Sequence, residues 1–165
     1  MKKIIKALIR YISTQIAKQQ IQQYGNDLKV NFPCTFTNKT TIGDNCNFNG
    51  IHISGLGKVK IGNNFHSGKD CIIMTSFHNY DEGTKIPYDN TYISKDVTIA
   101  DNVWLGHRVI ILGGVSISEG AIIQAGSVVV SNIPYCSIAG GHPAKVFKYR
   151  NIEHYESLKR QKQFN

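Results

Sequence analysis

A six-residue repeat runs through most of the chain, and this period restricts the possible folds more than any other feature. Seven consecutive hexads start at Ile93, each with an aliphatic residue first and a small or β-branched residue fifth: ISKDVT, IADNVW, LGHRVI, ILGGVS, ISEGAI, IQAGSV and VVSNIP. Shifted copies cover residues 30–53 and 61–78. A period of six fits neither an amphipathic helix nor an array of hairpins.

The hexads predict a solenoid shaped as a triangular prism, with one hexad on each face. Position-one residues would stack inside, position-five residues would lie near the corners, and Gly, Asn and Asp at positions two to four would form turns that tolerate a positive φ. The fourteen hexads predict between four and five coils over residues 30–134. Because no coil buries its own apolar face, stacking between coils must supply the stability.

Two interruptions and two flanking segments complete the predicted domain, which spans residues 1–165. Residues 54–60 and the loop 79–92 separate the blocks of hexads. Residues 135–165 form a C-terminal extension, with a polar helix at 150–163 that carries His154 on its surface. Residues 2–23 are predicted to form an amphipathic helix, with this apolar stripe: Ile5, Leu8, Ile9, Ile12 and Ile16.

Two interpretations of the role of the N-terminal helix remain open. The stripe is predicted to dock on the first coil and so protect an open edge, which a solenoid needs. The alternative is peripheral attachment to a membrane, with the basic residues facing anionic lipid. No segment is long and apolar enough to predict a membrane span.

The net charge limits the classes of partner to be expected, and the cysteines indicate the cellular compartment. The net charge of +8 fits nucleic acid, a phosphorylated cofactor or an acidic membrane surface. No P-loop, dinucleotide-binding glycine motif or nucleic-acid-binding signature is present, so nucleic acid is not expected. Cys34, Cys46 and Cys71 share position five, which predicts small buried side chains and not disulfides. This favours a reducing, cytoplasmic compartment, with the inner face of the membrane as a possible location.

The block IADNVWLGHRVIILGGVSISEGAIIQAGSVVV and the later AGGHPAKVFK carry a family resemblance. They resemble the hexapeptide-repeat acyltransferases, and most of all the maltose, galactoside and polysaccharide O-acetyltransferases. The resemblance covers about residues 30–148. It implies a left-handed parallel β-helix, an exception to the right-handed crossover rule. It also implies a homotrimer with sites between subunits and acetyl-CoA as co-substrate.

His78 is the candidate catalytic residue. It ends the hexad IMTSFH just before the long interruption, where a loop would leave a rigid corner. In the resembling family, a histidine about two dozen residues before a VW[IL]G motif is the catalytic base, and here Trp104 of that motif follows His78 by 26 residues. The resemblance implies that His78 takes the proton of an attacking hydroxyl group, without an acyl-enzyme. Asp81 and Glu82 are both candidates to orient its ring.

The remaining site residues are assigned largely by the resemblance. For the acceptor they are Asn47, Asn49, Tyr80 and Asp81. For the cofactor they are Trp104, Gly106, His107, Ala125, Gly126, Lys145 and Lys148. The two lysines would meet CoA phosphates, and the backbone amides of Gly106 and His107 would stabilise the oxyanion. Packing between subunits is the alternative role of Trp104.

The expected reaction is acetyl transfer from acetyl-CoA to a saccharide hydroxyl group, on a surface polysaccharide or its precursor. An antibiotic or an amino sugar is the alternative acceptor. A non-enzymatic binding scaffold, with His78 as an idle corner residue, is the other alternative. No metal is expected, because the six histidines lack the H-x4-H spacing of zinc-binding β-helix enzymes.

Overall fold

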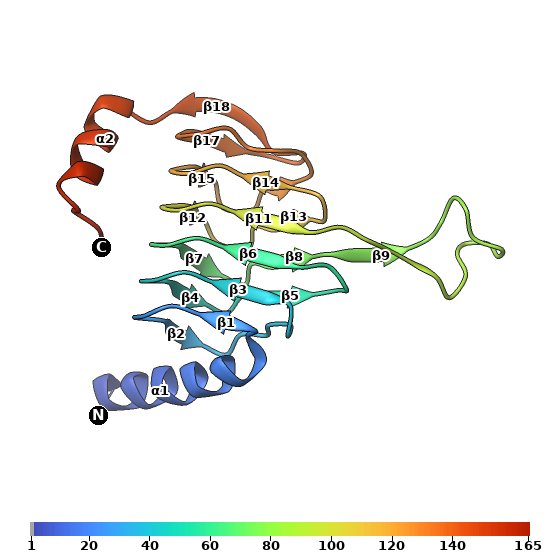
Figure 1. Cartoon of the computed structure of the whole chain (residues 1–165), viewed down its shortest axis with the longest axis horizontal. Coiled ribbons are helices and arrows are strands. Elements are labelled where there is room, and N and C mark those ends of the chain that lie inside the picture. Colours follow the sequence, from blue (N-terminus) through green and yellow to red (C-terminus); the bar gives the residue numbers. More distant parts are fainter. Residues whose placement is uncertain (1) are drawn as a thin grey trace.

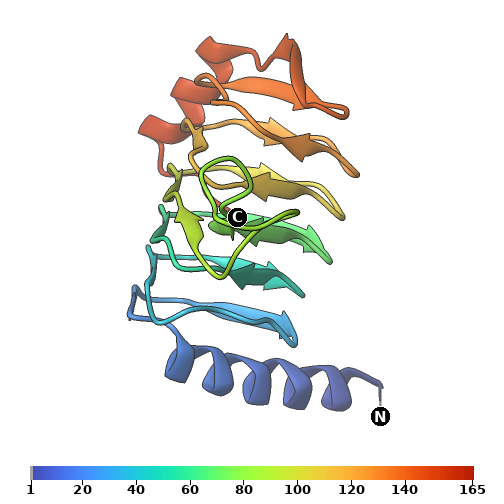
Figure 2. The same cartoon turned by 90° about the vertical axis from the view of Figure 1, so that its right-hand side faces the viewer.

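The computed structural model describes residues 2–165 and is a parallel β-helix of about six turns between two helices (Figure 1). The expected fold class is therefore confirmed. The solenoid has more than the four to five coils predicted, because it already begins at β1, before Val30, and β17 adds to it after Ile133. Figure 2 shows the turns stacked along one axis, with α1 across one end.

Three sheets form the faces of the prism. Face A consists of β1 (Gln23–Tyr24), β3 (Thr40–Ile42), β6 (Val59–Ile61), β11 (Val97–Ile99) and β14 (Ser116–Ile117). Face B consists of β2 (Lys29–Phe32), β4 (Asn47–Asn49), β7 (His66–Lys69), β12 (Trp104–Leu105), β15 (Ile122–Ile123), β17 (Ser137–Gly140) and β18 (Lys145–Tyr149). Face C consists of β5 (His52–Ser54), β8 (Ile72–Met74), β13 (Ile110–Leu112) and β16 (Val128–Val129). Within the faces only β18 is antiparallel to its neighbour.

The core follows the hexads closely. Six of the seven position-one residues that start at Ile93 are buried, and so are all seven position-five residues. Position four carries the positive φ values of many corners: Asn45, Asn64, Asp70, Asn102, Arg108, Gly114, Gly120 and Gly126. Cys46 and Cys71 are buried and Cys34 is half-buried, all as free thiols. Burial raises the pKa of the Cys46 thiol to about 11, which keeps it protonated at neutral pH.

Helix α1 (Lys2–Gln20) lies across the N-terminal end of the solenoid (Figures 1 and 2). It ends three residues earlier than predicted, and the predicted docking of its apolar stripe on the first coil is wrong, because those residues are exposed. Its buried residues are Ser13, Thr14 and Ala17. The open edge of the first turn requires hydrogen-bond acceptors: Thr14 Oγ1 accepts from Val30 N at 3.1 Å, and Gln20 Oε1 accepts from Phe36 N at 2.8 Å. The helix therefore covers the edge with its polar side.

Helix α2 (Ile152–Arg160) is shorter than the predicted 150–163 and lies along the side of the solenoid. Asn151 caps it, with its Oδ1 accepting from His154 N at 2.9 Å. Glu119 anchors it by accepting from Tyr155 OH at 2.9 Å and pairing with Lys159 at 2.6 Å. His154 is exposed, as predicted.

The long interruption forms a two-stranded arm that projects from the solenoid (Figures 1 and 2). Its strands β9 (Ser76–His78) and β10 (Tyr92–Ser94) pair antiparallel, so the interruption is 76–94 and not 79–92. The predicted placement of His78 at the last rigid corner is wrong, as is the corner position that the hexad rule gives to Phe77 at position five of IMTSFH. The pairing of β9 with β10 draws both residues out of the coil. Thr75 is the buried corner residue instead, and its carbonyl oxygen accepts from Lys95 N at 2.9 Å across the base of the arm.

Among residues 2–165, no helix is long and apolar enough to cross a membrane.

Candidate active site

A row of neighbouring residues crosses face B at one register. The strand pairings place these residues side by side, in this order: Asn47, His66, Trp104, Ile122, Ile138 and Lys148. The first four occupy position six of their hexads and are exposed or half-buried. Neighbouring strands lie about 4.8 Å apart, so roughly 14 Å of sheet separates the backbones of Trp104 and Lys148. The face B row thus aligns one predicted acceptor residue with two predicted cofactor residues.

Both predicted phosphate-binding lysines lie on β18, which pairs antiparallel with β17. Lys148 is opposite Ile138 and Lys145 is opposite Gly140. Ile138 and Gly140 are two residues apart, so they face the same side of the sheet. A register shift between Ile138 and Ala139 therefore lets two lysines that are three apart in sequence share this outer side. Both are exposed.

The corner between faces B and C brings together four further predicted cofactor residues. Gly106 N donates to Ile123 O at 2.8 Å, and Gly126 N donates to His107 O at 2.7 Å. A Cβ at Gly106 would lie 2.5 Å from Ala125 N, so only glycine fits this stacking of coils. At Gly126 a Cβ would meet nothing within 4 Å, so its outer side is open.

The two predicted oxyanion donors differ in this corner. The Gly106 amide is already bonded to Ile123 O, so its prediction as an oxyanion donor is wrong. The amide of His107 has no hydrogen bond to any other described residue from 2 to 165 and stays a candidate. The His107 ring accepts at Nδ1 from Lys69 N at 2.6 Å, so a neutral ring carries its proton on Nε2.

The two candidate acceptor asparagines on β4 also differ. Asn49 is held by its neighbours, because its Nδ2 donates to Ser67 O at 2.7 Å and its Oδ1 accepts from Asn31 Nδ2 at 3.1 Å. Asn47 is half-buried, and its side chain makes no hydrogen bond to the part of the chain that the structure describes. Asn47 is therefore the more available of the two for an acceptor hydroxyl group.

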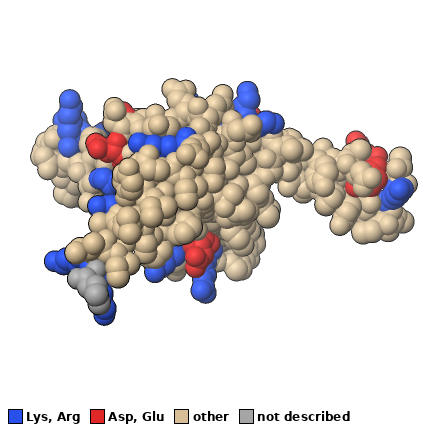
Figure 3. Space-filling view, turned by 90° about the horizontal axis from the view of Figure 1, so that it is seen from below, with Lys and Arg blue, Asp and Glu red and all other residues tan. Residues whose placement is uncertain are grey.

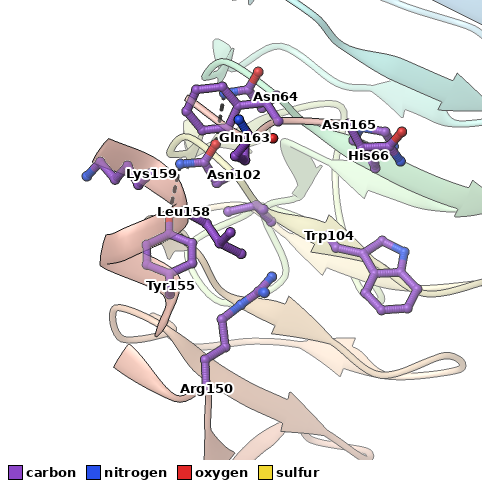
Figure 4. Close-up of a pocket in the computed structure, with 12 residues that line it drawn as sticks. Asn64, His66, Asn102, Trp104, Arg150, Tyr155, Leu158, Lys159, Gln163 and Asn165 are labelled. Carbon is purple, nitrogen blue, oxygen red and sulfur yellow. Dashed lines mark hydrogen bonds between the residues drawn. The ribbon is translucent and has the colours of Figure 1, made fainter. Parts of the chain in front are cut away.

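His66, between Asn47 and Trp104, was not predicted as a site residue. It lines a cavity of about 550 Å³ together with Trp104, Arg150 and Tyr155 (Figure 4). Burial lowers the pKa of His66, opposed by a hydrogen bond with the backbone of Asn165. Its hexad position, the same as that of Trp104, is the sequence signal that could have identified it.

His78 lies on the arm, with its ring packed against two tyrosine rings. The Tyr88 ring stacks on it at 3.7 Å between centroids and 13° between planes, and the Tyr92 ring lies at 4.5 Å. Its Nδ1 is buried and has no hydrogen-bond partner among residues 2–165. Neither Asp81 nor Glu82 therefore orients that nitrogen within the chain. Tyr80 and Asp81, the other predicted acceptor residues, are exposed on the arm.

One chain does not bring His78 together with the face B row. The arm leaves between β8 of face C and β11 of face A, and it extends away from the solenoid (Figure 1). Asn47, Trp104 and Lys148 lie on the remaining face. The predicted site is therefore divided between the arm and face B.

Among residues 2–165, no group of three or more His, Cys, Asp or Glu side chains is placed to hold a metal ion.

Comparison with known proteins identifies the family. The sequence model of the bacterial transferase hexapeptide family (six repeats) matches residues 89–131. The chain is 32% identical over 148 residues to WbbJ of Escherichia coli K12, a candidate lipopolysaccharide biosynthesis O-acetyl transferase, covering 78% of this chain and 76% of WbbJ. The chain belongs to the bacterial transferase hexapeptide family.

Two further likenesses extend this result. The candidate acetyltransferase YJL218W of Saccharomyces cerevisiae is 37% identical over 119 residues, which is 71% of this chain and 59% of the yeast protein. The chain thus spans less than two thirds of that relative's length. A galactoside acetyltransferase in complex with coenzyme A aligns with a TM-score of 0.73 and 27% identity, covering 86% of this chain and 71% of the other.

Proposed function

We propose that this protein transfers an acetyl group from acetyl-CoA to a hydroxyl group of a saccharide, such as a surface polysaccharide or its precursor, with His78 as the general base. The observation that carries the proposal is the face B row, which aligns Asn47 with Trp104 and Lys148 in a chain that is 32% identical to a candidate O-acetyl transferase. The Nδ1 of His78 is buried within the arm. The acceptor hydroxyl group would therefore approach Nε2 of the same ring.

The proposed reaction is a direct transfer. A neutral His78 ring takes the proton of the acceptor hydroxyl group while the hydroxyl oxygen attacks the thioester carbonyl carbon. The carbon–sulfur bond then breaks, the proton passes from His78 to the departing sulfur, and CoA leaves as a thiol. The stacked ring of Tyr88 and the tilted ring of Tyr92 would hold the imidazole in place during both proton transfers.

Face B and its corner offer groups suited to CoA. Lys145 and Lys148 present two cations on one side of the sheet, where they would bind phosphate groups. The open outer side of Gly126 leaves room for a slender pantetheine arm beside the corner. Trp104 is 52% exposed and would pack against that arm.

A second copy of the chain would complete the site. The arm carries exposed aromatic and aliphatic side chains at Tyr80, Ile86, Tyr88 and Tyr92, of which Ile86 is 99% exposed. An arm that leaves its own solenoid can insert such residues against face B of a neighbour. In a closed ring of three subunits, each arm would contact face B of the neighbouring subunit, so no arm would be left without a partner.

The first test measures thiol release from acetyl-CoA with a panel of saccharides, amino sugars and antibiotics. We expect His78→Ala to lower kcat by about 10²- to 10⁴-fold, the usual contribution of a general base. His52→Ala, which removes an exposed histidine of face C, is the matched control and should retain activity. Equal turnover in the wild type and His78→Ala would refute the base assignment. Transfer to antibiotics or amino sugars alone would refute the saccharide hydroxyl acceptor.

The second test examines whether the site is shared between chains. His78→Ala and Trp104→Ala chains are each inactive or weak alone and are then co-expressed. In random trimers, roughly one site in four would combine an intact arm with an intact face B. Recovery of about that fraction of activity supports a shared site, whereas no recovery would place both residues of a site in one chain.

A further inference from the structure

Helix α1 exposes its apolar side and turns its polar side toward the solenoid, the reverse of what is expected of a docked helix. Its apolar side chains are between 38% and 73% exposed: Ile4, Ile5, Leu8, Ile9, Tyr11, Ile12 and Ile16. The side facing β2 carries small and basic residues. Lys3, Lys6 and Arg10 line a cavity with Asn31 and Phe32, which Ile9 of the apolar set also borders. Ser13, Thr14 and Ala17 are buried. We call the exposed set the α1 stripe.

The α1 stripe is larger than ordinary surface exposure explains. Single exposed apolar residues are normal, but a contiguous apolar patch bordered by polar residues marks an interaction site. The buried Ser13, Thr14 and Ala17 face the first turn, so Ile4, Leu8 and Tyr11 on the opposite side of the helix face away from the solenoid. Ile9, Ile12 and Ile16 also line a hollow beside Pro33 and Cys34. The α1 stripe runs the length of the helix on a surface free of protruding loops at that end of the solenoid (Figure 2).

The charged residues of α1 itself are all basic. Residues 2–26 contain five basic side chains, Lys2, Lys3, Lys6, Arg10 and Lys18, and the first acidic residue is Asp27. At 100° per residue, Lys2 borders one edge of the stripe and Lys18 the other. Figure 3 shows this end as a mainly tan surface with several Lys and Arg side chains in blue and smaller patches of Asp and Glu in red.

We propose that the α1 stripe binds an anionic lipid surface, with the solenoid standing on the membrane by its N-terminal end. An in-plane helix with an apolar face and basic polar residues is the arrangement that inserts at the boundary of headgroups and acyl chains. A helix is about 10–12 Å across, so even the basic residues next to β2 lie near the lipid headgroups and can extend toward them.

The same charges argue against a second copy as the occupant. Two α1 stripes packed face to face would bring Lys2 and Lys18, which border each stripe, next to those of the second copy. No acidic residue within residues 2–26 could compensate for that repulsion. Anionic headgroups remove the same repulsion, so lipid fits both the apolar and the charged part of the surface.

The test is co-sedimentation of the full chain with vesicles of phosphatidylcholine, with and without phosphatidylglycerol. We expect binding to the anionic vesicles that weakens with salt. Leu8→Gln/Ile12→Gln should lower the partition coefficient by roughly 100-fold, while Gln preserves helix propensity. The matched control Val130→Gln/Ile152→Gln removes two exposed apolar residues elsewhere and should leave binding unchanged.

A second pair of variants tests the charge. Lys2→Gln/Lys6→Gln should weaken binding to anionic vesicles by roughly 25-fold, about fivefold for each charge. Lys58→Gln/Lys60→Gln, which removes two exposed lysines near face A, should not. Circular dichroism verifies that each variant keeps its helix content.

Three outcomes would overturn the proposal. The first is that Leu8→Gln/Ile12→Gln binds vesicles as well as the wild type does. The second is that the wild type binds equally well to vesicles with and without phosphatidylglycerol. The third is that two particles of the wild type associate without vesicles and do not bind vesicles, and that Leu8→Gln/Ile12→Gln abolishes this self-association. Acetyl transfer to a soluble saccharide should stay at the wild-type rate in this variant, so failure of the membrane proposal is distinguishable from failure of the proposed activity.

Discussion

The solenoid and the arm of this protein are stabilised in opposite ways. The largest fully buried side chains, from Phe48 to Ile133, all belong to the solenoid. None of residues 76–94 is buried, although this segment carries His78 and the aromatic residues around it. The arm has only its paired strands, its stacked rings and its turn hydrogen bonds to order it.

This difference assigns stability and proposed chemistry to separate regions. A periodic stack gains its free energy of unfolding from contacts between neighbouring turns. A projecting arm adds little to that free energy, so its sequence is free to vary with the acceptor. Changes in the arm should therefore alter activity at constant stability, and changes in the stack should do the reverse.

Removal of the arm should have the largest effect on activity. Replacing residues 76–94 by one glycine leaves four residues between Met74 and Val97, the same number as Gly55–Lys58 in the preceding turn. We expect acetyl transfer to fall at least about 10⁴-fold, or roughly 5 kcal/mol in activation free energy. Thermal unfolding should stay cooperative, with a midpoint within a few degrees of the wild type.

Two results would contradict this separation. Acetyl transfer at the wild-type rate without the arm would place the general base elsewhere. A broad or absent unfolding transition would mean that the arm is part of the folding unit. Both are read from the same purified variant.

The reverse case is a substitution in the stack. The ring of Phe48 is fully buried, 5.3 Å from the Phe36 ring and 5.2 Å from the Phe65 ring. Phe48→Ala should lower the free energy of unfolding by about 3–5 kcal/mol, as measured in urea. Phe32→Ala, at a 40% exposed ring on β2, is the control and should cost far less. A similar loss in both would mean that burial does not decide stability here.

Two glycines of the B–C corner allow a finer comparison within the stack. Gly106→Ala places a Cβ 2.5 Å from Ala125 N, so two coils must separate, at a cost of about 2–3 kcal/mol. Gly126→Ala meets no atom within 4 Å, and its cost of about 1 kcal/mol comes from the positive φ of 73°. Urea unfolding of both variants measures the difference. Equal costs would mean that coil spacing at this corner is not tight.

The sequence predicted the stack because one residue type serves one position in every turn. Each aliphatic residue at position one has a single environment, so the burial of residues such as Ile111 and Ile123 follows from the period. The cofactor corner at Gly106 and Gly126 and the alignment of Asn47 with Trp104 follow from the same register. The resemblance supplied their roles.

The sequence could not predict features that depend on non-periodic pairing. The antiparallel pairing of β9 with β10 moved His78 off the corner, and no hexad rule contains that pairing. The Gly106 amide was assigned to the oxyanion although the next coil already uses it. The side of α1 that faces the solenoid is the one that carries Thr14, because the backbone amide of Val30 requires a hydrogen-bond acceptor there. Hydrophobic periodicity contains no information about such a donor.

The smallest expected effect is a local pH dependence at the tip of the arm. Asp89 accepts from Thr91 Oγ1 at 2.5 Å, and from Thr84 N and Thr91 N at 2.8 Å each. These hydrogen bonds, with the Thr91 hydroxyl first, hold the pKa of Asp89 below its ordinary value of 3.8. A lowered pKa means that the carboxylate orders the arm fully above about pH 4 and loses this effect as the pH falls further.

The measurement is hydrogen exchange of the Thr84 and Thr91 amides, corrected for intrinsic rates. Their protection should drop roughly threefold between pH 6 and pH 3 in the wild type. It should be low and nearly independent of pH in Asp89→Asn. Asp81→Asn, at an exposed aspartate on the same arm, should behave as the wild type. Because the arm contributes little to the stack, the urea midpoint of Asp89→Asn should match the wild type at pH 7. A lower midpoint would show that the tip of the arm and the solenoid unfold together, which would end the distinction between the two regions.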